Sequence, residues 1–126
     1  MYFSNTFILL ITLLFTMLTL NVVTALPLHR RASYSGDGTF YTVGLGSCGK
    51  TNSDSEMVAA LSSSLMSGGK NCGKSLKVTS DSGSVTVKAV DTCPSCAEGD
   101  VDFSPAAFKK LGSLDEGRIS INWSFT

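Results

Sequence analysis

Histidine is almost absent from this 126-residue chain. The only one is His29, which precedes the segment that we expect to fold. A folded part without an imidazole excludes serine–histidine and cysteine–histidine catalysis, and it excludes zinc sites with a histidine ligand. Carboxylates, amines, hydroxyl groups and aromatic rings remain as candidate functional groups. We expect neither a metal ion nor a cofactor.

An excess of charge of either sign is also lacking. Ten Lys and Arg residues balance ten Asp and Glu residues, and charged residues make up 16% of the chain. Binding to phosphate backbones depends on clustered basic side chains, and this sequence has no basic run of that kind. The composition therefore argues against a nucleic-acid partner.

The first part of the chain has the pattern of a segment that is removed. Residues 1–25 carry no charged side chain, residues 7–20 are apolar except for threonines, and Val23-Thr24-Ala25 offers small residues for cleavage. This pattern predicts a signal peptide over residues 1–25. A signal anchor is the alternative, but the apolar run is shorter than the ~20 residues of a membrane span.

Residues 26–31 end in the dibasic pair Arg30-Arg31. We interpret them as a short propeptide cut by a kexin-type protease, with an ordinary basic arm as the alternative. The mature chain is then residues 32–126, with eight basic and ten acidic side chains. We expect a secreted monomer, in the extracellular space or the cell wall, that has no membrane association after cleavage of the signal.

Four cysteines, an even number, fit an oxidising compartment. A four-cysteine zinc site is the competing interpretation, but such sites usually combine two Cys-x-x-Cys pairs, and only one is present. A redox-active pair is disfavoured because a loop, not a helix, is expected to follow it. Two disulfides are therefore predicted, and the residues alone leave all three pairings open. The cysteines are Cys48, Cys72, Cys93 and Cys96.

The remaining residues predict short strands and two helices. After a flexible lead-in over 32–37, β-branched and aromatic residues or alternating patterns predict strands at 39–43, 76–79, 85–90, 101–103 and 117–125. A capping box at 53–56 predicts a helix over 57–66, and Ser104-Pro105 predicts the start of a second. We expect an all-β barrel with two short helices outside it. Phe108 and Trp123 are expected in its core, and Tyr34 and Tyr41 are candidates for stacking on sugars.

Five short motifs occur in one order: GTFY at 38–41, GSCG at 46–49, CGK at 72–74, VDTCPSC at 90–96 and VDFSPAAF at 101–108. In these motifs the chain resembles single-domain proteins of the rare-lipoprotein-A-like, barwin and expansin superfamily, and it is most similar to small secreted fungal members such as loosenins. The resemblance covers about residues 36–123. It implies a six-stranded double-psi β-barrel with two short peripheral helices and a shallow polysaccharide groove. By resemblance to barwin-type barrels, the disulfides would be Cys48–Cys72 and Cys93–Cys96.

The resemblance also implies site residues. Asp102 matches the aspartate that expansins need for wall loosening and that related endoglucanases use as general acid. Asp91 matches a second groove aspartate, Thr39 matches a groove threonine, and Tyr41 lies close by. Two carboxylates that converge on one cleft would raise one pKa by repulsion. The alternative is that both aspartates merely cap backbone amides.

Two departures from the family pattern bear on catalysis. Related endoglucanases carry a base aspartate just after the first-strand Thr-x-Tyr, where this chain has Thr42 and Val43. Transglycosylases of the rare-lipoprotein-A type have a histidine after an Ala-Ala pair, and here Leu61 follows. An inverting hydrolase needs a group that activates water. We therefore expect no enzymatic activity.

The function implied is non-hydrolytic loosening of cell-wall polysaccharide, cellulose or chitin, through a groove that contains Asp102 and Asp91. The alternative is an inhibitor of papain-like cysteine proteases, or a secreted effector, that acts through surface loops. The sequence does not identify the polysaccharide. Asn122-Trp123-Ser124 is a glycosylation sequon in an expected core strand, and its occupancy stays open.

Overall fold

The computed structural model describes residues 22–25 and 31–126. The chain divides into two units, Met1–Arg30 and Arg31–Thr126. Residues 22–25 are exposed and have no regular secondary structure. The rest of the predicted signal peptide, and the predicted propeptide up to Arg30, lie outside the described residues. Among the residues that are described, no helix has both the length and the apolar character needed to cross a membrane.

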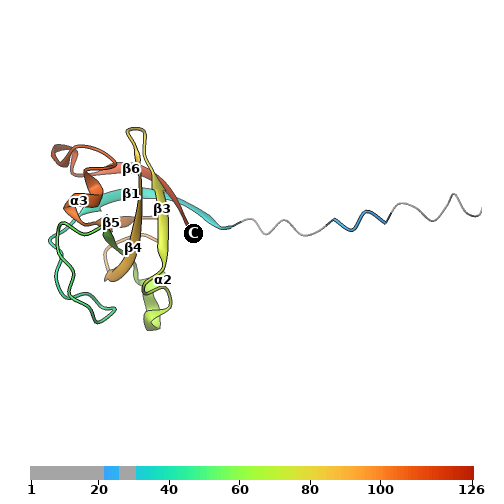
Figure 1. The fold of residues 1–126 in the computed structure, drawn as a ribbon, viewed down its shortest axis with the longest axis horizontal. Coiled ribbons are helices and arrows are strands. Elements are labelled where there is room, and N and C mark those ends of the chain that lie inside the picture. Colours follow the sequence, from blue (N-terminus) through green and yellow to red (C-terminus); the bar gives the residue numbers. More distant parts are fainter. Residues whose placement is uncertain (1–21, 26–30) are drawn as a thin grey trace, which may run out of the picture. The chain divides into compact units, whose positions relative to one another are not determined.

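The second unit is a closed barrel of six strands in the order β1-β5-β2-β4-β3-β6 (Figure 1). The pairs β1–β5 and β2–β4 are parallel and the other four pairs are antiparallel. Two helices of four residues each follow β2 and β5. The all-β barrel with two short helices is therefore confirmed. The elements are β1 (Ser33–Phe40), β2 (Val58–Ser62), α2 (Ser63–Met66), β3 (Ser75–Thr79), β4 (Ser84–Cys93), β5 (Val101–Phe103), α3 (Pro105–Phe108) and β6 (Ile119–Phe125), with 3₁₀ turns at Ser67–Gly69 and Leu114–Glu116.

Alternating side chains from the strands fill the barrel. Along β4, Val87 and Ala89 are buried while Thr86 and Lys88 point outward, which is the period of two expected of a strand with one solvated face. Phe108 is fully buried, so the prediction that it belongs to the core is confirmed. The fully buried side chains with the largest volumes are Leu61, Leu76, Val78, Val87, Val101, Phe103, Phe108, Leu111 and Ile121.

The helix predicted over 57–66 is wrong in its first half. Val58 to Ser62 form β2, and only Ser63–Met66 are helical. Every residue of β2 is buried, both those that face the barrel interior and those that face outward. A short apolar run that is buried on both faces has no period with which to tell a strand from a helix.

The flexible lead-in predicted at 32–37 is also wrong, because β1 begins at Ser33. Residues 33–38 pair with β6, and β1 ends at Phe40, before the expected residue 43. Gly36 crosses close to the loop after β4: a Cβ at Gly36 would lie 2.4 Å from the carbonyl carbon of Gly99. The Gly residues that indicate flexibility in the sequence here allow two backbones to approach each other.

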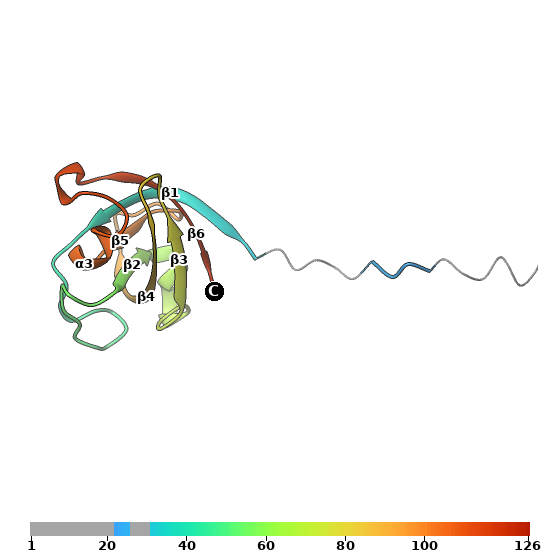
Figure 2. The same ribbon diagram turned by 45° about the horizontal axis from the view of Figure 1, so that its top comes forward.

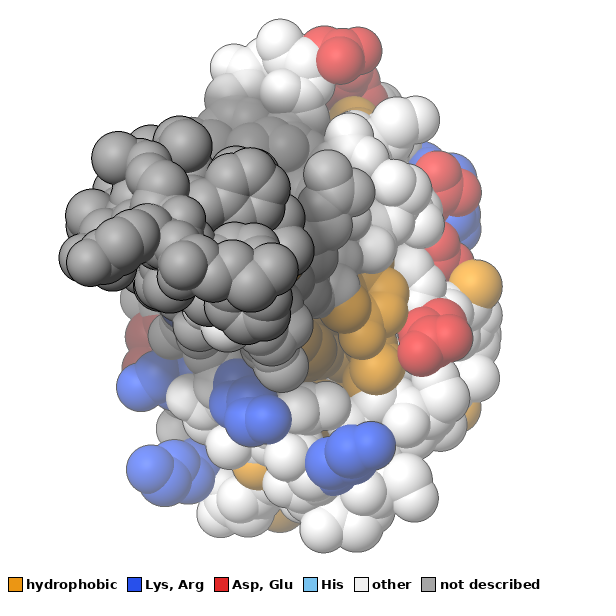
Figure 3. All heavy atoms as spheres, turned by 90° about the vertical axis from the view of Figure 1, so that its right-hand side faces the viewer, with side chains coloured by type: hydrophobic (Ala, Val, Ile, Leu, Met, Phe, Trp, Pro, Cys, Tyr) orange, Lys and Arg blue, Asp and Glu red, His pale blue; other side chains and the backbone are white. Residues whose placement is uncertain are grey.

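An aromatic cluster joins β1 to β6. The Tyr34 ring stacks on Trp123 with 4.3 Å between centroids, and both rings meet Phe125 edge to face. Trp123 is 3% exposed and its indole N–H donates to the Gly99 carbonyl at 2.8 Å, so the prediction that it belongs to the core is confirmed. Figure 3 views the side of the barrel on which β1 begins, where hydrophobic surface is exposed between charged side chains.

A long loop, residues 41–57, leaves the barrel between β1 and β2 (Figure 2). It is anchored at several points: the Tyr41 amide donates to the Phe103 carbonyl of β5, and the Ala106 amide of α3 donates to the carbonyl of Asp54. Cys48 joins the loop to Cys72 by a disulfide. These anchors fix the loop against the wall formed by β5, β2 and β4.

Candidate functional site

Four residues lie side by side across four neighbouring strands, and we call them the acidic row. Thr39 of β1 is in register with Asp102 of β5, Asp102 with Ala60 of β2, and Ala60 with Asp91 of β4. Strands are about 4.8 Å apart, so the row extends over about 14 Å. Both aspartates are partly exposed, whereas Ala60 between them is 2% exposed and adds only a methyl group. The strand order therefore brings together Thr39, Asp91 and Asp102, which are far apart in the sequence.

Asp102 has an unusual electrostatic environment. Burial raises the pKa of its carboxyl group above the ordinary value of 3.8, and repulsion from Asp91 adds to this effect. A hydrogen bond from the Thr39 hydroxyl to Asp102 Oδ1, 3.0 Å long, and the charge of Arg118 lower the pKa but do not cancel the effect of burial. Asp102 therefore keeps a proton to a higher pH than an ordinary aspartate does.

The alternative role considered for Asp102, capping the amides before the second helix, is performed by another residue. The Ser104 hydroxyl accepts a hydrogen bond from the Ala107 amide at 3.2 Å and donates one to the Glu56 carbonyl. The Asp102 carboxylate instead accepts a hydrogen bond from the hydroxyl of Thr39, its neighbour in the row.

Asp91 does organise backbone, as the alternative interpretation expects. Its Oδ1 accepts hydrogen bonds from the amides of Ser47 and Thr92, at 2.9 and 2.7 Å. The Ser47 hydroxyl also lies 2.7 Å from the Thr92 hydroxyl. Asp91 thus holds the loop before Cys48 against the end of β4, and it does so while lying in the acidic row.

Tyr41 lies at the end of β1 with its hydroxyl group buried and, within the described part of the chain, without a hydrogen-bond partner. Burial raises the pKa of this phenol to about 12, and the charges of Asp91, Asp102 and Asp54 contribute to the shift. The hydroxyl therefore stays protonated at any physiological pH. A buried hydroxyl without a partner costs free energy of folding, so this group destabilises the ligand-free protein.

The third of these carboxylates, Asp54, is absent from the predicted site. In the sequence it appears inside the capping box of the predicted helix, and the structure has a turn there instead. Its Oδ1 accepts a hydrogen bond from the Val43 amide at 2.7 Å. No local sequence pattern predicts this contact, because it depends on how the loop of residues 41–57 folds back.

Tyr34, the other candidate for sugar stacking, does not belong to the site. It precedes Thr39 by five residues along β1, a separation of about 17 Å in an extended strand. Its ring is occupied by the stack on Trp123. Tyr34 therefore contributes to the packing of β1 on β6.

All four cysteines form disulfides, Cys48–Cys72 and Cys93–Cys96, with Cα separations of 5.7 and 5.4 Å. This is the pairing that the barwin resemblance implied. The first disulfide anchors the loop whose Ser47 amide contacts Asp91. The second closes a short loop between Asp91 and Asp102. Within residues 22–25 and 31–126, no three Cys, Asp or Glu side chains are grouped so that they would hold a metal ion.

Comparison with known proteins agrees with this architecture. A double-psi β-barrel family model described as "Lytic transglycolase" matches residues 33–123. An EG45-like domain containing protein of Citrus jambhiri is 32% identical over 116 residues, which cover 79% of this chain and 88% of the relative.

Two solved structures share the fold. An expansin variant of Clavibacter michiganensis in complex with cellohexaose aligns with a TM-score of 0.70 and 31% identity, over 75% of this chain and 50% of the expansin. Streptomyces papain inhibitor aligns with a TM-score of 0.67 and 33% identity, over 75% of this chain and 94% of the inhibitor. This chain therefore spans about half the length of the expansin.

The closed six-stranded barrel with two parallel pairs defines the molecule as a double-psi β-barrel protein. More narrowly, the chain belongs to the rare-lipoprotein-A-like family of these barrels, the family that includes expansin-like and EG45-like proteins.

The buried hydroxyl of Tyr41 leads to a first prediction. Tyr41→Phe should raise the free energy of unfolding by about 1 kcal/mol, because it removes a buried donor that has no partner. Urea unfolding of the ligand-free protein measures the difference. Tyr34→Phe is the matched control, since the Tyr34 hydroxyl is not a buried group without a partner. A clear loss of stability in Tyr41→Phe would show that the hydroxyl is bonded in solution.

Proposed function

We propose that the protein binds cell-wall polysaccharide, cellulose or chitin, along the acidic row and loosens it without hydrolysis. The observation that carries the proposal is the row itself, with its two partly exposed carboxylates. Polysaccharide chains present many hydroxyl groups. The carboxylates of Asp91 and Asp102, which are partly exposed, would accept hydrogen bonds from them. Such contacts would compete with those between neighbouring chains in the wall.

The comparisons support this proposal because an expansin with the same fold is known in complex with cellohexaose. We further propose that the protein is secreted to the wall as a monomer, starting near Ala32 after removal of the predicted signal peptide and propeptide. Removal of the signal peptide and removal of the propeptide both cut the chain before the barrel begins.

The proposal that no bond is cleaved rests on two positions. Thr42 and Val43 stand where related endoglucanases have the base, and the fully buried Leu61 stands where transglycosylases have a histidine. Asp54 lies beside the position of that base, where its Oδ1 accepts a hydrogen bond from the Val43 amide. We infer that Asp54 anchors the loop and does not activate water.

The test combines binding with sugar release. Wild-type protein should co-sediment with insoluble cellulose or chitin and release no reducing sugar from either. Asp54→Asn should leave binding unchanged, because the amide oxygen can still accept the hydrogen bond from Val43. Sugar release by the wild type that disappears in Asp54→Asn would identify Asp54 as a base and refute the non-hydrolytic proposal.

A second candidate function is inhibition of a papain-like cysteine protease. It is favoured by the likeness to the Streptomyces papain inhibitor, of which 94% is covered. Leu45, in the loop beside Cys48, is 73% exposed, and an apolar side chain at a loop tip suits the cleft of a protease. A papain assay run beside the sedimentation test separates the two functions. Inhibition that Leu45→Asp abolishes, without any binding to polysaccharide, would replace the first proposal with the second.

A further inference from the structure

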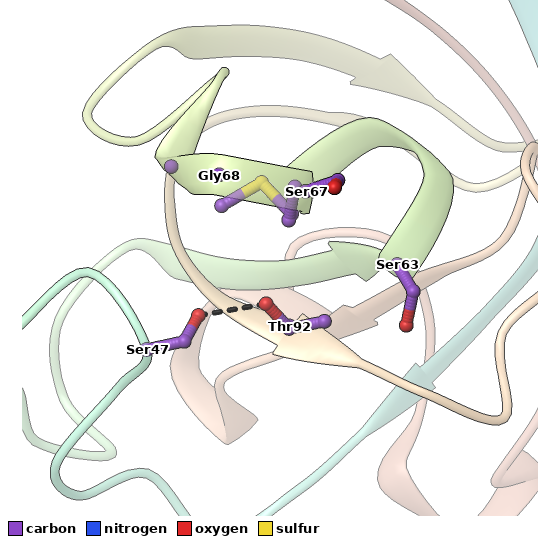
Figure 4. Close-up of a pocket in the computed structure, with 7 residues that line it drawn as sticks. Ser47, Ser63, Ser67, Gly68 and Thr92 are labelled. Atoms are coloured by element: carbon purple, nitrogen blue, oxygen red, sulfur yellow. Dashed lines mark hydrogen bonds between the residues drawn. The ribbon is translucent and has the colours of Figure 1, made fainter.

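A cavity of about 370 Å³ opens beside the acidic row. In Figure 4, Ser47 and Thr92 lie together on one side of it, Ser67 and Gly68 lie opposite them, and Ser63 stands apart from both pairs. Met66, Gly68 and Gly69 complete its lining. We call this cavity the serine pocket. Its volume falls within the range of small-molecule sites in proteins.

The serine pocket adjoins the Asp91 end of the row. Ser47, in its wall, donates its amide to Asp91 Oδ1 at 2.9 Å, and its hydroxyl lies 2.7 Å from that of Thr92. Thr92 follows Asp91 in β4, and Ser63 directly follows β2, the partner of β4. The serine pocket therefore lies at the ends of β2 and β4 and is joined to Asp91 through Ser47, within reach of a chain that passes over Asp91.

The lining selects for an uncharged, hydroxylated ligand. No charged side chain lines the serine pocket, so an ionic group would enter it without a counter-charge. The hydroxyl groups of Ser63 and Ser67 can each donate and accept a hydrogen bond, and those of Ser47 and Thr92, which are bonded to each other, keep one donor between them. The thioether of Met66 offers an adaptable apolar surface, and the Gly68 backbone leaves space above it. A pyranose ring has the matching chemistry, with hydroxyl groups at its rim and C–H groups on its faces.

We propose that the serine pocket is a sugar subsite that binds one further unit of the polysaccharide beyond Asp91. This inference rests on the proposed binding along the acidic row. The pocket then sets how long an oligosaccharide must be to bind with full affinity. It holds its sugar through Ser63 and Ser67, which have no part in the row.

Calorimetric titration with cello-oligosaccharides and chito-oligosaccharides of increasing length tests the inference. For wild-type protein the affinity should rise with length, and the last effective unit should contribute about tenfold. The variant Ser63→Ala/Ser67→Ala should lose most of that last increment. Ser67→Phe, which fills the pocket, should lose all of it. Both variants should bind shorter oligosaccharides like the wild type, which shows that the row and the fold are intact.

The matched controls are Ser84→Ala and Ser84→Phe, the same changes at an exposed serine at the start of β4, outside the pocket. Both control variants should keep the full gain in affinity from the last sugar unit. If the wild type shows this gain and the pocket variants keep it too, the inference is wrong and the row alone binds the chain. If the wild type binds no oligosaccharide of either series at any length, the proposed function fails and the subsite fails with it.

Discussion

Asp102→Asn should abolish the polysaccharide effect and leave the barrel folded. The amide keeps the size of the side chain and can still accept the hydrogen bond from Thr39, but it has neither the charge nor the acidic proton. Weakening of cellulose or chitin networks, measured beside co-sedimentation, should fall to the level of a protein-free control. Asp91→Asn should have a smaller effect on the polysaccharide, since Oδ1 can still take the Ser47 and Thr92 amides.

The raised pKa of Asp102 gives this variant a second signature. The folded state binds the proton more tightly than the unfolded chain does, so this carboxyl group stabilises the fold below pH 3.8. That contribution is lost as the pH rises from 3.8 through the raised pKa. In Asp102→Asn the unfolding free energy should depend less on pH within this window. If Asp102→Asn keeps the full polysaccharide effect, Asp102 has no role in the site.

Removal of the Cys48–Cys72 disulfide should produce the largest loss of stability. The bond links residues 24 apart, and the entropy of closing such a loop in the unfolded chain corresponds to about 3 kcal/mol. Urea unfolding of Cys48→Ala/Cys72→Ala should show this decrease. Polysaccharide binding should also weaken, because the loop that places Ser47 against Asp91 loses its anchor.

The second disulfide serves as the internal comparison. Cys93 and Cys96 are three residues apart, so Cys93→Ala/Cys96→Ala should cost clearly less. Equal losses in the two double variants would show that loop entropy does not dominate. Peptide mapping of the wild type that joined Cys48 to Cys93 or Cys96 would contradict both the structure and the prediction.

The parts of the fold that follow from the sequence are those with a clear local pattern. Alternation over residues 85–90 predicts a strand, and the structure has β4 there. Ser104 before Pro105 predicts the start of α3, and Ser104 caps it. Thr39, Asp91 and Asp102 are expected to share a site only from the family motifs, because carboxylates on separate strands leave no local sign that they converge.

The features that the sequence does not predict depend on contacts between distant segments. Strand β2 has no period because it is buried on both faces. The first half of β1 is rich in Ser and Gly, which favour loops, and only pairing with β6 makes it a strand. Asp54 reaches Val43 through the fold of a long loop, and the serine pocket combines side chains from three separate segments.

The pairing of β1 with the last strands has a consequence for how the protein acquires its structure. Tyr34 is opposite Trp123, so the first part of β1 finds its partner only after the rest of the barrel has been synthesised. Such a high contact order predicts slow folding after translation, because long loops must close before their contacts contribute. Until β6 arrives, β1 and β3 expose unpaired edges, and edges of that kind template aggregation. A nascent chain that stalls before β6 is therefore at risk for as long as its synthesis remains incomplete.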